Sequence, residues 1–150
     1  MSLLSAKFKL MFDEFTLNID IETSIGGFTV LFGPSGSGKS SFLRCISGLE
    51  RSSGGFLKVG DEIWQDDKRG IFLQANKRKI GYVFQEMRLF PHLNVKGNLF
   101  YGLKRSTQKN SDTFFDKIVE ILGLGSLLNR HTHHLSGGEK QRVALGRALL

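Results

Sequence analysis

The chain has 150 residues, of which 40% are apolar, and its formal net charge is +7. This length suits one domain with a hydrophobic core, and no apolar run approaches the ~18 residues that a membrane-spanning helix needs. The N-terminus lacks a basic stretch followed by an apolar one, so we expect no secretion signal. The positive charge is compatible with nucleic acid or an acidic membrane surface, but the basic residues are scattered except in the cluster 77–79, which favours a solvated face.

Alternating apolar and polar residues over 7–12 and again over 16–21 open the chain. A period of two predicts a half-exposed antiparallel pair of strands, with the turn near Asp13 and Glu14. The next segment, 28–32, is apolar throughout. It predicts a strand buried in a parallel sheet.

Residues 33–40 have the spacing G-x-x-x-x-G-K-[ST], which binds the phosphates of a nucleotide triphosphate. They are Gly33, Pro34, Ser35, Gly36, Ser37, Gly38, Lys39 and Ser40, and we include the adjacent Ser41 among the nucleotide-binding residues. Glycines let successive N–H groups turn toward a polyphosphate, and the helix that follows directs its positive end at the same anion. Lys39 is expected to contact the β- and γ-phosphates, and Ser40 to bind Mg²⁺. The alternative, a glycine-rich surface turn with one lysine, does not explain the preceding strand and the following helix.

Four apolar residues at helical spacing follow this loop: Phe42, Cys45, Ile46 and Leu49. They predict one buried helix face, and Gly48 is a plausible helix stop. Cys45 lies on the inward face, so we expect a small core residue. As the single cysteine it excludes an intramolecular disulfide, which suits the cytosol.

Three further predicted strands follow, and after them two predicted helices. Residues 56–59 and 63–64 predict strands around a turn at 60–62, and 80–84 predicts a strand that ends at Gln85. From Val95 the pattern is helical, and a second helix over 111–122 has Gly123 as its stop.

Residues 135–141 form a second chemical feature. Ser136 is a natural N-cap, and Glu139 stands three residues later, at the spacing of a capping box. Gly137 and Gly138 weaken a helix start locally, which is reasonable if the backbone must approach an anion closely at the helix N-terminus. Considered alone, a well-capped helix explains this segment equally well.

Taken together, the motifs at 33–40 and 135–141 resemble those of the ATP-binding subunits of ABC transporters, in which the serine–glycine–glycine element is the signature sequence. The resemblance implies an α/β P-loop NTPase fold with a RecA-like parallel sheet core, an antiparallel β subdomain and a helical signature subdomain. About 1–94 would be the nucleotide-binding core with its β subdomain, and about 95–150 the helical subdomain.

The same resemblance implies an ATPase mechanism with ATP and Mg²⁺. Two copies of the subunit form a head-to-tail dimer, and each ATP lies between the phosphate loop of one copy and the signature helix of the other. The signature residues that would contact the γ-phosphate region are Ser136, Gly137, Gly138 and Glu139. Gln85 would act with Lys39 in catalysis, reaching Mg²⁺ and the attacking water and reporting the nucleotide state to the membrane subunit. Phe12 would stack on adenine, although a core phenylalanine explains it equally well.

A narrower similarity concerns the transported substrate. Residues 80–99 look like the ATP-binding subunit of molybdate importers, and so do 51–65 and 101–103. The element Leu-Phe-Pro-His at 89–92 is shared with sulfate and sugar importers, whereas Val-Lys-Gly-Asn-Leu at 95–99 is closer to the molybdate group. The implied protein is peripheral on the cytoplasmic face of the inner membrane, with permease subunits and, indirectly, a substrate-binding protein as partners and no nucleic acid. An ABC-type ATPase of DNA maintenance is disfavoured, because the interval between the two motifs leaves no room for a long insertion.

Members of this family continue beyond the signature helix with a strand carrying an aspartate for Mg²⁺ and a glutamate that activates water, followed by a switch histidine. We therefore expect a chain truncated before the end of the core and inactive alone; a non-enzymatic nucleotide-binding fragment is the remaining alternative. His131, His133 and His134 precede the signature. A metal site there lacks a supporting carboxylate pattern, so we favour a polar loop.

Overall fold

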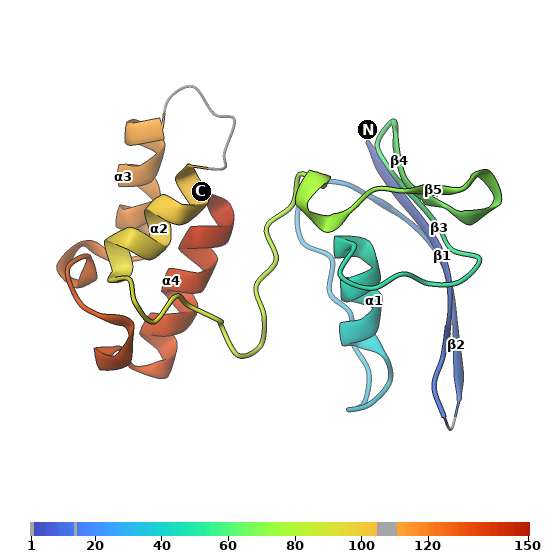
Figure 1. Ribbon diagram of the computed structural model, residues 1–150, viewed down its shortest axis with the longest axis horizontal. Coiled ribbons are helices and arrows are strands. Elements are labelled where there is room, and N and C mark those ends of the chain that lie inside the picture. Colours follow the sequence, from blue (N-terminus) through green and yellow to red (C-terminus); the bar gives the residue numbers. More distant parts are fainter. Residues whose placement is uncertain (1, 14, 105–110) are drawn as a thin grey trace. The chain divides into compact units, whose positions relative to one another are not determined.

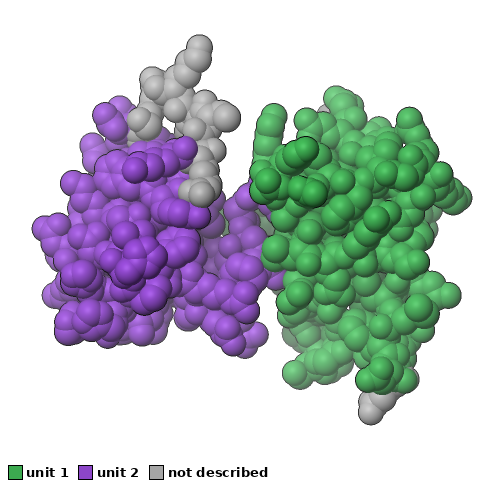
Figure 2. All heavy atoms as spheres, viewed as in Figure 1, with its two compact units in different colours: residues 1–79 green, residues 80–150 purple. Residues whose placement is uncertain are grey.

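The computed structural model describes residues 2–13, 15–104 and 111–150 (Figure 1). It divides into two compact units, Met1–Lys79 and Ile80–Leu150, which are coloured separately in Figure 2. The sequence predicts a different division, into a nucleotide-binding core at about 1–94 and a helical subdomain at about 95–150. That division into functional subdomains stays a prediction. No helix among the described residues is long and apolar enough to cross a membrane.

An antiparallel sheet forms the first unit. Strands β1 (Leu3–Met11) and β2 (Thr16–Ser24) pair over their whole length, with Phe8 opposite Ile19. The remaining strands are β3 (Phe56–Val59), β4 (Glu62–Asp66) and β5 (Ile71–Phe72). The strand order is β2-β1-β3-β4-β5, and every neighbouring pair is antiparallel. The predicted opening pair and the predicted strand at 56–59 are thus confirmed.

Helix α1 (Lys39–Ser47) packs against β1 (Figure 1). Phe42 and Cys45, on its inner face, join a core formed by alternate residues of β1 together with Leu57 and Trp64. The helix ends at Gly48, whose φ of 76° is left-handed. The predicted helix, its stop and the core position of Cys45 are therefore confirmed. The predicted burial of Leu49 is wrong, because this residue lies beyond the helix end and is 42% exposed.

The second unit is helical. It contains α2 (Val95–Leu103), α3 (Ser111–Ile121) and α4 (Gly137–Leu149), and α4 packs against both of the others (Figure 1). The core they share includes Val95, Leu99, Phe115, Ile118, Leu124 and Val143. The helical pattern predicted from Val95 and the helix stop at Gly123, with a φ of 58°, are confirmed.

Two predicted strands are absent from the described structure. Residues 28–32 and 80–84 are coil, and neither segment pairs with any described strand. Phe28 and Phe32 are completely exposed, and Val30 is 82% exposed. The physical reason is that strand structure requires hydrogen-bonded neighbours, which an apolar run does not supply by itself. The observed sheet is antiparallel, so the parallel core remains a prediction.

Candidate functional site

The glycine-rich loop at 33–38 leads directly into α1. Gly38 is the N-cap of the helix and has a φ of 85°. A Cβ at this position would lie 2.6 Å from Cδ2 of Leu17 and 3.5 Å from the ring of Phe12. Both the left-handed backbone and the crowding favour glycine here, so the motif's second glycine fixes the junction between loop and helix.

Lys39 folds back over the loop that precedes it. Its Nζ donates to the carbonyl oxygens of Gly33 (2.9 Å) and Pro34 (2.6 Å) and to Oγ of Ser37 (3.3 Å). The ammonium group is therefore held over the loop, where an incoming anion would be bound. The anionic oxygens of a phosphate are stronger acceptors for this ammonium group than the neutral carbonyl oxygens, so a phosphate can replace them.

The N-terminus of α1 is open. Among the described residues no side chain caps it, and its first turn contains no acidic residue. Its unpaired N–H groups and positive dipole end are consequently available to an anion. Ser40 is exposed and Ser41 is half-buried in this first turn. The Ser40 hydroxyl is a hard oxygen ligand, which fits Mg²⁺ held beside a bound phosphate.

A cleft of about 470 Å³ borders the loop, lined by residues 17–21 of β2, the loop itself and Phe42. Phe12 lies next to it, because its ring approaches Gly38. The Phe12 ring stacks on Phe15 with centroids 4.6 Å apart, and Phe15 is 41% exposed. The structure thus brings Phe12 to the phosphate loop and adds Phe15, which the sequence pattern did not single out.

The opposite end of α1 is held by Arg78. Its Nη1 donates to the carbonyl oxygens of Cys45 (2.8 Å) and Ile46, and its Nε donates to Leu73 O (2.9 Å). The guanidinium also faces the rings of Trp64 and Phe72. Arg78 therefore closes the carbonyl end of the helix whose other end carries Lys39.

This position of Arg78 corrects the solvated face expected for the basic cluster 77–79. Lys77 and Lys79 are exposed, but Arg78 is only 5% exposed. Burial lowers the pKa of its guanidinium, which nevertheless stays charged. Its charge is compensated by the carbonyl dipoles at the end of α1 and by aromatic faces, none of which the sequence run indicates.

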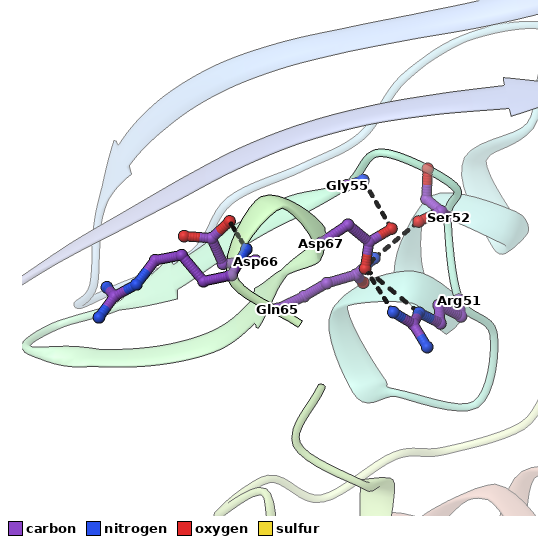
Figure 3. Close-up of polar contacts among 7 residues, drawn as sticks. Arg51, Ser52, Gly55, Gln65, Asp66 and Asp67 are labelled. Carbon is purple, nitrogen blue, oxygen red and sulfur yellow. Dashed lines mark hydrogen bonds and ion pairs between the residues drawn. The ribbon is translucent and has the colours of Figure 1, made fainter. Parts of the chain in front are cut away.

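The segment after α1 is tied to the sheet through Asp67 (Figure 3). Oδ1 of Asp67 accepts from Nη2 of Arg51 (2.8 Å), and Oδ2 accepts from the N–H of Gly55 (3.3 Å). The buried Gln65 amide donates to the carbonyl of Ser52 at 2.6 Å. Burial acts to raise the pKa of Asp67, but the hydrogen bonds from Arg51 and Gly55 outweigh it and lower that pKa. This network links the chain that leaves α1 to β4.

The N-terminus of α4 is closed by a complete capping box. Oγ of Ser136 accepts from the N–H of Glu139 (3.3 Å), and the N–H of Ser136 donates to Oε2 of Glu139 (2.7 Å). The hydrogen bond from the Ser136 backbone lowers the pKa of Glu139. Apart from the neighbouring residues and the backbone of α4 itself, no described atom lies within 4 Å of a Cβ built on Gly137 or Gly138. The packing of the described residues therefore does not require these two glycines, and they leave an open backbone surface.

Gln85 is exposed at the apex of a tight turn. The N–H of Met87 donates to the carbonyl of Phe84 (2.9 Å), which places Gln85 and Glu86 at the centre of the turn. Met87 and Arg88, directly after it, have left-handed φ values of 56° and 43°. Non-glycine residues adopt this region at a cost, so the surrounding structure must stabilise this conformation.

The predicted site residues fall into two groups. Phe12 and residues 33–41 lie together in the first unit, whereas Gln85 and the signature residues 136–139 belong to the second. His131, His133 and His134 are exposed, with stacked or tilted rings, and no group of three potential ligands among the described residues could hold a metal ion. Sequence reasoning did not find Arg78, because nothing in a short basic run distinguishes a buried arginine from an exposed one.

Comparison with known proteins gives one family and many close relatives. The family model described as "ABC transporter" matches residues 16–150, which include both motifs. The chain is 48% identical over 147 residues to the molybdenum import ATP-binding protein ModC of Pseudomonas savastanoi pv. phaseolicola, covering 98% of this chain and 41% of that protein. It is 51% identical over 144 residues to the protein of the same name from Thiobacillus denitrificans, covering 96% and 39%.

A third similar protein is the molybdenum import ATP-binding protein ModC 1 of Azotobacter vinelandii, 47% identical over 145 residues, with 97% of this chain and 40% of that protein covered. The chain thus spans about two-fifths of the length of the curated relatives that it matches.

Proposed function

The chain belongs to the ABC transporter family, and on this premise we propose that it is part of an ATP-binding and ATP-hydrolysing subunit that powers an importer of molybdate. The observation that carries the proposal is the uncapped N-terminus of α1, with Lys39 held over a glycine-rich loop. The names of the similar proteins from three bacteria support molybdate as the substrate. An importer of sulfate is the second candidate, because the element at 89–92 is shared with that group.

The proposed nucleotide site is centred on the phosphate loop. The N–H groups of 36–40 and the start of α1 bind the β- and γ-phosphates, and Nζ of Lys39 moves from its carbonyl partners to the phosphate oxygens. The Ser40 hydroxyl and the Gln85 side chain would be ligands of Mg²⁺, which would supply positive charge to offset the charge that develops on the transferred phosphoryl group. Phe12 stacks on adenine beside the cleft that borders the loop.

The second half of the proposal concerns the signature residues. We assign Ser136, Gly137, Gly138 and Glu139 to ATP held by another copy of the subunit in a head-to-tail dimer. The open backbone at Gly137 and Gly138 supports this role, because glycine costs helix stability and no packing among the described residues requires it. Glu139 contributes by fixing the Ser136 cap rather than by donating to phosphate, since an ionised carboxylate only accepts.

The fold of the complete protein follows from the same premise. The relatives are more than twice as long as the matched region, so we propose that 28–32 and 80–84 become strands of a parallel core sheet in a longer protein. The exposed apolar side chains of 28–32 support this, because a parallel sheet buries its strands on both faces. The complete protein would be a peripheral subunit on the cytoplasmic side of a permease, supplied by a substrate-binding protein.

Replacement of Lys39 tests nucleotide binding in the complete gene product. Lys39→Ala should weaken MgATP binding about 100-fold, because charge-assisted hydrogen bonds contribute about 1.5–3 kcal/mol each. Lys77→Ala is the matched control, as it removes an exposed lysine of the same unit. Titration calorimetry measures both affinities. Equal affinity of the Lys39→Ala variant and the parent would remove the basis of the proposal.

The substrate is tested separately. The complete subunit, reconstituted with its permease and binding protein, should hydrolyse ATP faster when molybdate is added, and sulfate at the same concentration should have no effect. Stimulation by sulfate alone would identify the second candidate. Stimulation by neither anion, with ATP turnover intact, would contradict the assignment to oxyanion import.

A further inference from the structure

Contacts among its own residues stabilise the turn that presents Gln85. The guanidinium of Arg88 lies over the Phe84 ring, with 4.3 Å between its central carbon and the ring centroid. The Met87 and Arg88 N–H groups close the turn by donating to Phe84 O and Glu86 O. These bonds shape the turn, but they do not attach it to the rest of the unit.

Arg147, in the last turn of α4, makes that attachment. Its Nη2 donates to the carbonyl oxygens of Arg88 (2.9 Å) and Met87 (3.3 Å), the two residues with left-handed backbone. Its Nη1 donates to Oδ1 of Asn98 (3.3 Å). The guanidinium also faces the ring of Phe90, 4.9 Å from its centroid. One side chain thus connects α4 to the carbonyl groups of Met87 and Arg88, the two residues directly after the Gln85–Glu86 turn.

Asn98 of α2 completes this connection. The residue is fully buried, and its Oδ1, which receives Arg147, also accepts from the N–H of Phe90 at 2.8 Å. Its Nδ2 donates to the carbonyl oxygens of Phe90, Leu93 and Asn94. The segment from the Gln85 turn to the start of α2 is therefore bonded at several points to one buried amide, and through it to Arg147.

The backbone that carries Arg147 is itself closely confined. A Cβ on Gly102 of α2 would collide with the carbonyl oxygen of Arg147, and a Cβ on Gly81 would collide with that of Ala148. Close backbone approach at these two points leaves the last turn of α4 little freedom to shift. A guanidinium placed on such a support holds its acceptors in a fixed position relative to the helix.

We propose that Arg147 is a positioning residue for Gln85: it holds Met87 and Arg88 in their left-handed conformation, so that the Gln85 turn and α4 move as one body. This inference rests on the proposed function, because only an ATPase in which Gln85 and the start of α4 both act on nucleotide would need Gln85 to be fixed relative to α4. Arg147 touches no nucleotide in this scheme. It makes the orientation of the exposed glutamine depend on the helix whose N-terminus is directed at the ATP of the other copy.

The attachment itself is tested by amide hydrogen exchange in the complete gene product. Arg147→Met should accelerate exchange in residues 84–90 about fivefold and leave 122–128 unchanged. Arg142→Met is the matched control, because Arg142 also lies on α4 and also donates to two carbonyls, those of Leu122 and Gly123. That variant should show the reverse pattern. If the parent protein hydrolyses no ATP, the proposed function fails, yet this measurement still reports on Arg147.

The consequence for catalysis is tested by steady-state kinetics and by rescue. Arg147→Met should lower kcat about tenfold while the KM for MgATP changes less than about twofold, whereas Arg142→Met should keep both values near those of the parent. Adding Met87→Gly to Arg147→Met should restore at least half of kcat, because glycine adopts the left-handed backbone without cost. A merely structural loss would not be repaired by a second substitution that itself adds flexibility.

Three results would overturn the proposal. If the exchange rates of residues 84–90 and the kcat of Arg147→Met both equal those of the parent, Arg147 does not position the Gln85 turn. Faster exchange at 84–90 and 122–128 alike, without rescue by Met87→Gly, would reduce Arg147 to general packing. If Arg147→Met does not fold, Arg147→Lys tests the proposal instead, because one ammonium group cannot bond both carbonyls and Asn98 together. A kcat of Arg147→Lys equal to that of the parent would then contradict the proposal.

Discussion

Helices α1 and α4 begin in opposite ways, although each has glycine and serine residues at its N-cap and in its first turn. Among the described residues no side chain caps α1, and its first turn contains a lysine and no acid. The first turn of α4 is closed by the reciprocal bonds of Ser136 and Glu139 and contains a carboxylate. The positive dipole end of α1 is therefore left for an outside anion, whereas that of α4 is partly neutralised by its own chain.

The comparison also separates two uses of glycine. Gly38 is required by its φ of 85° and by the crowding of Leu17, so its role lies within the chain. Gly137 and Gly138 face open space, so no packing among the described residues requires glycine there. In the proposed function the first helix start binds a phosphate by itself. The second would offer a backbone surface that a phosphate bound to another copy approaches.

The largest expected effect comes from adding a charge at the start of α4. Gly138→Asp should lower ATP turnover at least about 100-fold, because in the proposed dimer the new carboxylate repels the phosphate held by the other copy. The same change should preserve or raise stability, since an acid in the first turn contributes about 0.3–1 kcal/mol and replaces glycine. Phosphate release and thermal unfolding measure the two quantities.

Gly138→Ala is the uncharged control for that variant. If the proposed head-to-tail dimer forms, mixing Gly138→Asp with Lys39→Ala gives dimers in which one composite site has both motifs intact and the other has both altered. Such mixtures should recover part of the turnover that each variant lacks alone. Parent-like turnover of Gly138→Asp would show that 135–141 is only a capped helix.

The two kinds of glycine are distinguished next by the same substitution at each helix start. Gly38→Ala should lower the free energy of unfolding by about 1–2 kcal/mol, because alanine adopts a left-handed backbone only with strain. Gly137→Ala should leave stability unchanged or slightly higher, as it adds a better helix former in open space. Urea unfolding of the two variants provides the measurement. Equal losses would remove the distinction between an internal and an external role.

Short-range patterns allowed most of these elements to be predicted. Helix α1, its stop at Gly48 and the Ser136–Glu139 box each depend on residues within one or two turns, so the sequence contains the whole signal. Pairing of β1 with β2 is similarly local. The uncapped start of α1 was predictable for the same reason, whereas its binding of nucleotide stays a prediction.

Features that depend on distant partners were not predictable. The apolar run at 28–32 indicates burial but not which strands would pair with it, and no described strand does. Arg78 reaches carbonyls of α1 more than 30 residues earlier, and Arg147 reaches a turn about 60 residues earlier. Neither arginine belongs to a motif, because their roles follow from where the chain folds back.

A smaller effect is expected when the cap of α4 is removed. Ser136→Ala should lower stability by about 1 kcal/mol, the usual loss for an N-cap, without changing ATP affinity at the phosphate loop. Ser40→Ala at the start of α1 should change stability by less than about 0.5 kcal/mol, since Ser40 is exposed and makes no cap. Thermal unfolding of both variants, beside the parent, tests the contrast. A larger loss for Ser40→Ala would mean that α1 has a capping interaction of its own.

The smallest expected effect is a pH dependence confined to α4. The backbone hydrogen bond from Ser136 lowers the pKa of Glu139 below its ordinary value, so the folded protein binds a proton there less readily than the unfolded chain. The ionised capping box therefore adds stability above the unfolded pKa of glutamate, about 4.3, and this contribution disappears as the pH falls through the lower folded pKa.

Glu139→Gln tests this pH dependence, because it keeps an acceptor oxygen for Ser136 but cannot ionise. The parent should thus unfold at a higher temperature than Glu139→Gln at pH 6, and the two curves should converge as the pH approaches 3. Asp67, whose folded pKa is also lowered, titrates in both proteins and cancels in the difference. A difference that grows as the pH falls would contradict an ionised carboxylate at the start of α4, and with it the contrast to the open start of α1.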